Sequence, residues 1–418
     1  MRARWLAGLG CLLGTSALAA VGCGGGGGGG GAGKTVKGNT LTVYSSLPLQ
    51  GPTRVNSVAV NNGAKIALSQ ASNKVGKYTI KFKTLDDSTA AAGKWDPSQT
   101  ADDARKAVSD PTTIAYMGEF NSGASAISIP ILNKAGILQV SPANTAVGLT
   151  KKEPGATAGE PTKYYPTGTR TYGRVVPRDK IQGAAMAIAM KDAGCKKAYV
   201  LNDKEVYGAG LASNFVSSAK SQGLTVLGNE GYDPKASNYR SLASKIKSKG
   251  ADCVFGSLIV DNNGVQLFKD LASGVPGAKL FAPDGCAEST FTDPKKGGVP
   301  ASIAPRIELT QPTLSPKEYP PAGRKFFADY KAKYGAAEPY AIYGYEAMSA
   351  ILDSIKRAGS KGNSRSDVRK MFFSIKNRKS VLGTYSIDKD GDTTITAEGL
   401  YTIKNGTLTF DKSIKASV

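Results

Sequence analysis

The sequence predicts an α/β protein with two lobes, each built on a doubly wound parallel sheet. Short apolar and β-branched runs alternate with longer segments whose apolar residues recur at helical spacing, which is the pattern of a parallel sheet covered by helices. The alternation occurs twice, before and after a stretch at 151–178 that is rich in Pro, Gly, Thr and charge. We expect this stretch to be a long surface loop that leads to a crossover between the lobes. The chain of 418 residues is long enough for two or three domains.

The first series of elements precedes the 151–178 stretch. We expect strands at 41–49, 78–85, 112–117 and 137–140, and helices at 56–71, 96–109 and 122–135. Helix 56–71 has Val60, Ala64, Ala67 and Leu68 on one face. Gly136 ends the third helix, since glycine is common just after a helix C-terminus.

The second series follows the same pattern. We expect helices at 179–194, 208–222, 238–249 and 263–273, and strands at 197–203, 224–230, 253–259 and 279–283. Asp179 is placed to cap its helix, with Gln182 three residues later as the partner of a capping box.

The C-terminal part mixes a strand, helices and a hairpin-like end. We expect a strand at 307–310, helices at 316–335, 338–359 and 364–376, and strands at 381–387, 399–403 and 407–410. The segment Asp388 to Asp392 is predicted to be a tight turn. It is not a calcium loop, because its glycine is misplaced and no bidentate glutamate follows at the required spacing.

Two small polar loops follow two neighbouring predicted strands of the first lobe. One leads from Gly118 through Phe120 to Ser122, and the other contains Ala143 and Thr145. Ligands of open α/β sheets bind outside the carboxyl ends of the strands. We therefore expect either a binding site here, with Ser122 capping a helix whose N-terminus suits an anion, or an ordinary βαβ unit with a capping serine.

Composition limits the possible chemistry. The sequence contains no histidine, so histidine-dependent nucleophilic catalysis and histidine metal sites are excluded. We expect no enzyme activity, no cofactor and no metal. The formal charge of +21 comes from lysines and arginines spread along the chain, which favours a solvated basic surface over nucleic-acid binding.

The N-terminus predicts export. Residues 1–22 read as a signal peptide, with a basic start and an apolar stretch too short to be a confident membrane span. The residues before Cys23 resemble a bacterial lipoprotein signal, in which the cysteine is lipidated and becomes the new N-terminus. The alternative is a plain secretory signal with an incidental Cys23. Residues 23–39 begin with Cys23 and a glycine run, and they are expected to be a flexible tether.

Three cysteines remain after the signal and Cys23 are set aside. Cys195 and Cys253 lie just before, or at the start of, two strands that are adjacent in the usual doubly wound order, so their sulfurs are expected to meet. We predict a Cys195–Cys253 disulfide in an oxidising compartment, with Cys286 free.

Several segments, in this order, resemble the substrate-binding proteins of ABC importers of the leucine/isoleucine/valine-binding type. The segments are LQGP (49–52), NNGAKIAL (61–68), TLDD (84–87), GILQVSPANT (136–145), RVVPRDKIQG (174–183), LNDKEVYGAG (201–210), FAPDG (281–285) and YAIYGYEAM (340–348). The resemblance covers about 40–410. It implies the type I periplasmic-binding fold, with three crossovers joining lobe one, 40–175 plus 307–392, to lobe two, 176–306 plus 393–418.

The resemblance also implies a ligand site. On lobe one, Ser122, Ala143 (through its backbone) and Thr145 correspond to residues that bind an amino acid's carboxylate and ammonium. On lobe two, Tyr207 corresponds to a tyrosine that touches the ligand, and Asp284 to the acid that meets the ammonium. Asn56 stands where an aromatic residue is often found in branched-chain amino acid binders, and Phe120 is expected to replace part of that aromatic wall.

Three kinds of function stay open at this stage. The first is a lipid-anchored binding protein, monomeric, at the outer face of the bacterial cytoplasmic membrane, which delivers an amino acid or a small amide to an ABC permease. The second is a ligand sensor for a membrane receptor. The third is an exported α/β enzyme, which the lack of histidine and of a nucleophile-elbow motif disfavours.

Overall fold

The computed structural model describes residues 34–416. The predicted signal, Cys23 and the glycine run lie outside the described residues. Among those that are described, no helix is both long and apolar enough to cross a membrane.

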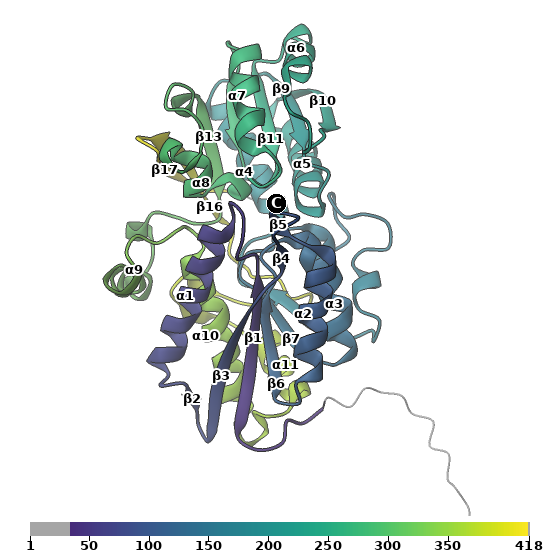
Figure 1. The fold of residues 1–418 in the computed structure, drawn as a ribbon, viewed down its shortest axis with the longest axis vertical. Coiled ribbons are helices and arrows are strands. Elements are labelled where there is room, and N and C mark those ends of the chain that lie inside the picture. The colour runs from purple at the N-terminus through teal and green to yellow at the C-terminus, as the bar shows by residue number, and fades with distance from the viewer. Residues whose placement is uncertain (1–33, 417–418) are drawn as a thin grey trace, which may run out of the picture. The chain divides into compact units, whose positions relative to one another are not determined.

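The first lobe is built on a six-stranded sheet with the order β2-β3-β1-β6-β7-β8 (Figure 1). The sheet is parallel except for β2, which pairs antiparallel with β3. Its strands are β1 (Thr40–Leu47), β2 (Lys74–Val75), β3 (Tyr78–Asp86), β6 (Thr113–Gly118), β7 (Leu138–Ser141) and β8 (Tyr172–Arg174). The helices around it are α1 (Arg54–Gln70), α2 (Pro97–Ser109), α3 (Ser122–Lys134), α9 (Pro321–Tyr334), α10 (Ala341–Arg357) and α11 (Arg365–Phe373).

The second lobe is built on a seven-stranded sheet with the order β10-β9-β11-β12-β13-β16-β17. Pairing is parallel as far as β13, and the last two strands are antiparallel. The strands are β9 (Lys197–Asn202), β10 (Thr225–Gly231), β11 (Cys253–Ser257), β12 (Lys279–Ala282), β13 (Ile307–Gln311), β16 (Ala397–Lys404) and β17 (Thr407–Lys415). The helices are α4 (Asp179–Asp192), α5 (Val206–Ala219), α6 (Arg240–Ser248), α7 (Gly264–Gly274) and the short α8 (Ser289–Thr292).

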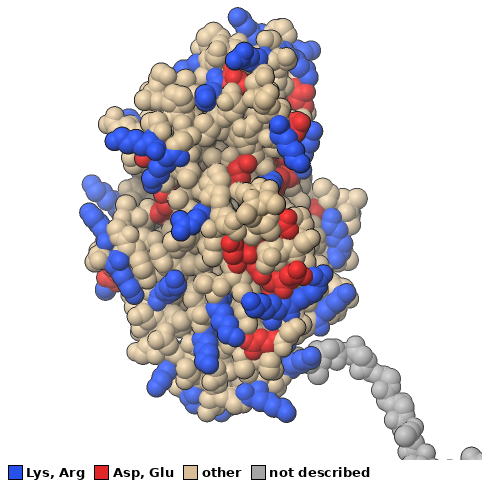
Figure 2. All heavy atoms as spheres, in the orientation of Figure 1, with Lys and Arg blue, Asp and Glu red and all other residues tan. Residues whose placement is uncertain are grey.

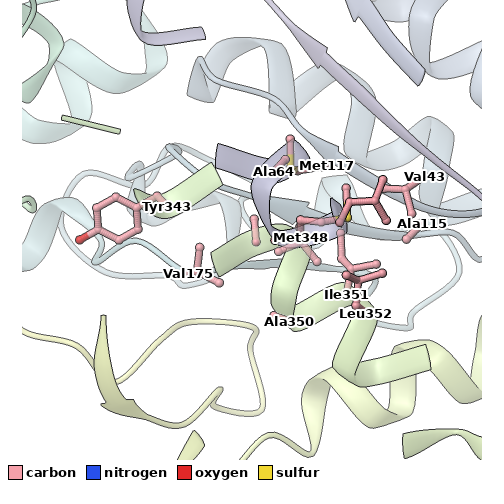
Figure 3. Close-up of a cluster of buried hydrophobic side chains, with 14 of the residues drawn as sticks. Val43, Ala64, Ala115, Met117, Val175, Tyr343, Met348, Ala350, Ile351 and Leu352 are labelled. Atoms are coloured by element: carbon pink, nitrogen blue, oxygen red, sulfur yellow. The ribbon is translucent and has the colours of Figure 1, made fainter. Parts of the chain in front are cut away.

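Each sheet has an apolar core on both faces. In the first lobe one cluster joins the sheet to α1 and α10, where Val43, Ala64, Met117, Met348 and Ile351 lie together (Figure 3). A second cluster joins the opposite face to α2 and α3. Strands buried on both faces are nearly continuous in apolar residues, which is why the sequence predicted them.

The division between the lobes differs from the prediction at one strand. Residues 307–311 were expected in lobe one, but β13 pairs with β12 and β16 in the second sheet. The sequence of a short apolar strand does not indicate which sheet the strand joins. Here the strand pairs with β12. Within residues 34–416 the chain therefore passes between the sheets after β8, after β13 and before β16.

Three local predictions need correction. The long loop expected at 151–178 contains β8, whose three residues are all buried in the first sheet. The expected strand 381–387 is shorter than predicted, since only β15 (Gly383–Tyr385) forms there, and it pairs in a hairpin with β14 (Arg378–Ser380). The tether was expected to extend to residue 39, but Val36 is only 2% exposed and its backbone exchanges two hydrogen bonds, both of 2.8 Å, with Asn363.

The strand order of the second sheet explains which cysteines are bonded to each other. β9 and β11 are neighbours, and a disulfide joins Cys195, just before β9, to Cys253 at the start of β11, with the Cα atoms 5.9 Å apart. Cys286 is a free, buried thiol. Cys195, Asp252 and Cys253 bring three potential metal-binding atoms together, but the two sulfurs are bonded to each other and are not available as thiolates.

The surface agrees with the even spread of charge in the sequence. Figure 2 shows lysines and arginines over the whole visible face, with no single basic patch.

Candidate ligand-binding site

The first-lobe side of the site consists of the loops after β6 and β7. Ser122 opens α3, and Asn121, not Ser122, occupies the capping position. The Ser122 hydroxyl instead accepts a hydrogen bond from the Ala146 N–H at 3.3 Å, and the Asn144 side chain donates to the Phe120 carbonyl at 2.8 Å. The predicted capping role of Ser122 is therefore wrong, because this hydroxyl joins the two loops.

A buried arginine supports the second loop from behind. Arg174 is fully buried on β8, and its guanidinium donates to the carbonyls of Asn144 at 3.1 Å and Ala146 at 2.9 Å. Its Nε lies 2.8 Å from the Asp392 carboxylate, which compensates its charge. Asp392 belongs to the predicted tight turn 388–392, where two backbone N–H groups bond to the Asp388 side chain. The turn thus holds the arginine that positions Thr145.

The second-lobe side centres on Asp284, which follows β12. One carboxylate oxygen accepts a hydrogen bond from the Tyr207 hydroxyl on α5, and the other accepts one from the Tyr340 hydroxyl just before α10. Tyr340 belongs to the first lobe, so Asp284 is bonded from both sides of the cleft. The Phe120 and Tyr340 rings meet edge to face, with centroids 5.4 Å apart.

These residues enclose a small cavity of about 30 Å³. All six residues predicted for the ligand site line it, together with four others. The lining is Phe120, Asn121, Ser122, Ala143, Thr145, Glu205, Tyr207, Ile259, Asp284 and Gly285. The structure thus brings the two lobe-one loops and the segments that follow three lobe-two strands, β9, β11 and β12, to one place. This is expected for the carboxyl edges of facing sheets.

The site is strongly acidic. Burial raises the pKa of Asp284, although its hydrogen bonds to Tyr207 and Tyr340 oppose the rise. Burial, together with repulsion from Asp284, raises the pKa of Asp179 to about 8 and places that of Glu398 well above its usual range. No lysine or arginine pairs with any of these three acids among residues 34–416. These three acids therefore have no cationic partner in the described part of the chain.

Asp179 does not form the predicted capping box. The Gln182 side chain donates to the Thr310 carbonyl at 2.9 Å, and in the described part of the chain neither oxygen of the Asp179 carboxylate has a hydrogen-bond partner. The helix begins at Asp179 itself, whose N–H donates to the Thr145 carbonyl at 2.8 Å. Asp179 thus connects the start of the second lobe to the first-lobe site.

Among the site residues that the sequence did not predict, Tyr340 and Glu205 make polar contacts between the lobes. Tyr340 lies in the YAIYGYEAM segment, but its place opposite Asp284 depends on how α10 packs, which no local pattern reveals. Glu205 lies in the loop after β9, at the same sheet edge as Tyr207, and the rule used for the first-lobe loops could have found it.

Comparisons of the sequence with known proteins cover both lobes. The sequence profile of the periplasmic binding protein family matches residues 42–407. A Leu/Ile/Val-binding protein of Rhizobium johnstonii is 25% identical over 383 residues, covering 88% of this chain and 93% of its own length. A Leu/Ile/Val-binding protein homolog of Brucella melitensis is 27% identical over 359 residues, covering 84% and 88%.

Solved structures share the fold over both lobes. The leucine-binding protein LivK of Thermotoga maritima superposes with a TM-score of 0.76 at 23% identity, over 90% of this chain and 99% of its own. A solute-binding protein of an ABC transporter from R. palustris, in complex with benzoate, gives a TM-score of 0.73 at 18% identity, over 91% and 97%. The predicted fold class is confirmed, and at these identities the likeness is one of fold alone.

Proposed function

Because this chain belongs to the periplasmic binding protein family, we propose that it captures an α-amino acid between its two lobes. The observation that carries the proposal is the arrangement around one cavity. Asp284, a buried carboxylate with no cationic partner among the described residues, faces the hydroxyl-bearing Ser122 and Thr145 of the other lobe.

The two sides suit the two charged groups of an amino acid. The ligand ammonium would replace one or both tyrosine hydroxyls on Asp284, forming a charge-assisted hydrogen bond in a site that water screens poorly. The ligand carboxylate would bind the hydroxyls of Ser122 and Thr145 and nearby N–H groups at the start of α3. The Ala143 N–H already donates to the Ser141 hydroxyl at 3.1 Å. Ala143 would therefore contact the ligand through its backbone carbonyl.

The side-chain pocket decides which amino acid binds. Phe120 and Ile259 belong to its apolar lining. Asn56, at a position where an aromatic residue is often found in branched-chain amino acid binders, is buried in the first turn of α1. The relatives named for leucine, isoleucine and valine support a branched-chain ligand, and the benzoate-bound neighbour shows that the fold also accepts other carboxylates.

Isothermal titration calorimetry tests the proposal. The protein, freed of bound ligand by partial unfolding and refolding, would be titrated with the twenty L-amino acids, benzoate and small amides such as acetamide. We expect at least one L-amino acid to bind, with leucine, isoleucine and valine the first candidates. Binding of benzoate or acetamide without any amino acid would contradict the proposal.

We further propose that the protein is a monomeric lipoprotein that delivers its ligand to an ABC importer. The family and the transporter proteins among its structural neighbours support delivery, and the sequence before Cys23 supports an anchor on the outer face of the cytoplasmic membrane. Cys23→Ala should release the protein from membranes. A variant that stays bound and unprocessed, like the parent, would point to a plain anchor.

A further inference from the structure

A small hairpin of the first lobe contacts the second lobe beside the ligand cavity. It consists of β4 (Ser88–Thr89) and β5 (Lys94–Trp95), which follow the carboxyl end of β3 (Figure 1). The Trp95 side chain packs against the second-lobe core cluster that includes Tyr207 and Leu211. On its other side it lies against α3, since a Cβ atom at Gly123 would be only 2.7 Å from its ring. The Trp95 side chain therefore lies between the two lobes and contacts both.

The hairpin binds one second-lobe carboxylate with two donors. Lys94 Nζ lies 2.6 Å from Glu205 Oε1 and 2.6 Å from the Asn262 side-chain oxygen. Trp95 Nε1 donates to Glu205 Oε2 at 3.1 Å, and the Asn262 amide donates to Oε1 at 3.0 Å. The side chains of Lys94 and Glu205 are 29% and 14% exposed, so water only partly screens this ion pair.

Glu205 also lines the ligand cavity, together with Asp284. Two carboxylates at one small cavity would attract two positive charges and repel a ligand carboxylate. Within the described residues Glu205 forms one salt bridge, with Lys94, and this lysine neutralises its charge. Asp284 is left as the carboxylate that can attract an ammonium group.

We propose that the hairpin 88–95 is the latch that closes this cleft, and that Lys94 restricts the cavity to ligands with a single ammonium group by neutralising Glu205. Lys94 is a positioning residue, since it acts through Glu205. The contact joins the two lobes, so its free energy favours the closed form and adds to ligand affinity. The inference rests on the proposed function for its ligand, but the latch itself does not.

A charge-restoration experiment tests the specificity role of Lys94. Calorimetry with L-leucine, L-isoleucine and L-ornithine, whose side chain carries a second ammonium, would compare wild type, Lys94→Ala and Lys94→Ala/Glu205→Gln. Lys94→Ala should weaken leucine or isoleucine binding by at least about tenfold and strengthen ornithine binding relative to them. Adding Glu205→Gln should restore most of the lost affinity, because the unpaired charge is gone. A deficit of up to about fivefold should remain, because the ion pair between the lobes is still missing.

A purely structural lysine would give a different result. In that case Glu205→Gln would not rescue Lys94→Ala and the preference for ornithine would not change, which would overturn the proposal. Lys245→Ala is the matched control, because Lys245 forms a 2.7 Å ion pair with Glu230 inside the second lobe and does not cross the cleft. It should leave all three affinities unchanged.

A second measurement needs no ligand. Lys94→Cys/Glu205→Cys should be bridged by a short bis-maleimide within one molecule, as mapped by mass spectrometry of tryptic peptides, whereas each single variant should not. Absence of the bridge in the double variant would overturn the latch. If no amino acid binds wild type, the proposed function fails, and this cross-link still decides whether the hairpin meets the second lobe.

Discussion

The two sides of the cleft differ in how they are charged and supported. The first-lobe side presents the hydroxyls of Ser122 and Thr145, and its charged support, Arg174, is buried behind the loop and paired with Asp392. The second-lobe side presents the carboxylates of Asp284 and Glu205 directly to the cavity. The two sides of the cleft therefore suit different ligand groups. The neutral side suits a carboxylate, and the acidic side suits an ammonium.

The largest expected effect comes from removing the buried cation behind the first side. Arg174→Met leaves Asp392 buried without its closest cationic partner, and loses the hydrogen bonds to the carbonyls of Asn144 and Ala146. Breaking a buried pair in this way typically costs about 3–5 kcal/mol of unfolding free energy. Urea denaturation would measure the loss.

The control for this experiment is an arginine in an exposed pair. Arg105 lies 2.6 Å from Asp102 with both side chains more than half exposed, so Arg105→Met should leave the stability nearly unchanged. A loss as small for Arg174→Met would mean that the loop at 143–146 does not depend on the arginine.

The next effect tests the acidic side. Asp284→Asn removes the charge that would hold the ligand ammonium, and leaving one buried charge unpaired typically costs about 2–5 kcal/mol. We expect amino-acid binding to weaken by roughly thirty- to several thousand-fold, as measured by calorimetry. Asp233→Asn, an exposed acid of the same lobe, should bind normally. If Asp284→Asn binds within threefold of wild type, Asp284 is only a turn residue.

The smallest effect, at most about 2.8 kcal/mol over the two pH units from pH 5 to pH 7, concerns Asp179. Its carboxylate has no hydrogen-bond partner in the described chain. Burial raises its pKa to about 8 from an ordinary 3.8, with repulsion from Asp284 adding to the rise. Between these values the unfolded chain has lost this proton while the folded protein keeps it. Folding stability should therefore fall as pH rises from about 4 to about 8, by at most about 1.4 kcal/mol per pH unit.

Urea denaturation at pH 5 and pH 7 would test this slope. Asp179→Asn should lose less stability than wild type between the two pH values, because its side chain does not titrate. Glu119, whose pKa is also raised to about 8 by burial, is present in both proteins and cancels in the comparison. Equal slopes would show that Asp179 is ionised in the folded protein.

Part of this structure could be predicted from the sequence, and part could not. Hydrophobic periodicity is a local property, and it located most of the buried strands and helices of both lobes to within a few residues, although it missed the three-residue strand β8. The loops at 118–122 and 143–145 were found because both follow strands of one sheet. Tyr340, the hairpin 88–95 and the sheet to which β13 belongs depend on packing between distant segments, which periodicity does not record. The resemblance added Tyr207 and Asp284, which no spacing argument singled out.

The most direct test of the central claim is the identity of the molecule that co-purifies with the protein. It would be released by denaturation and identified by mass spectrometry. The polarity of the cleft predicts an α-amino acid with one ammonium and one carboxylate group. A carboxylate without an amine, such as benzoate, would leave Asp284 without its partner and would contradict the account.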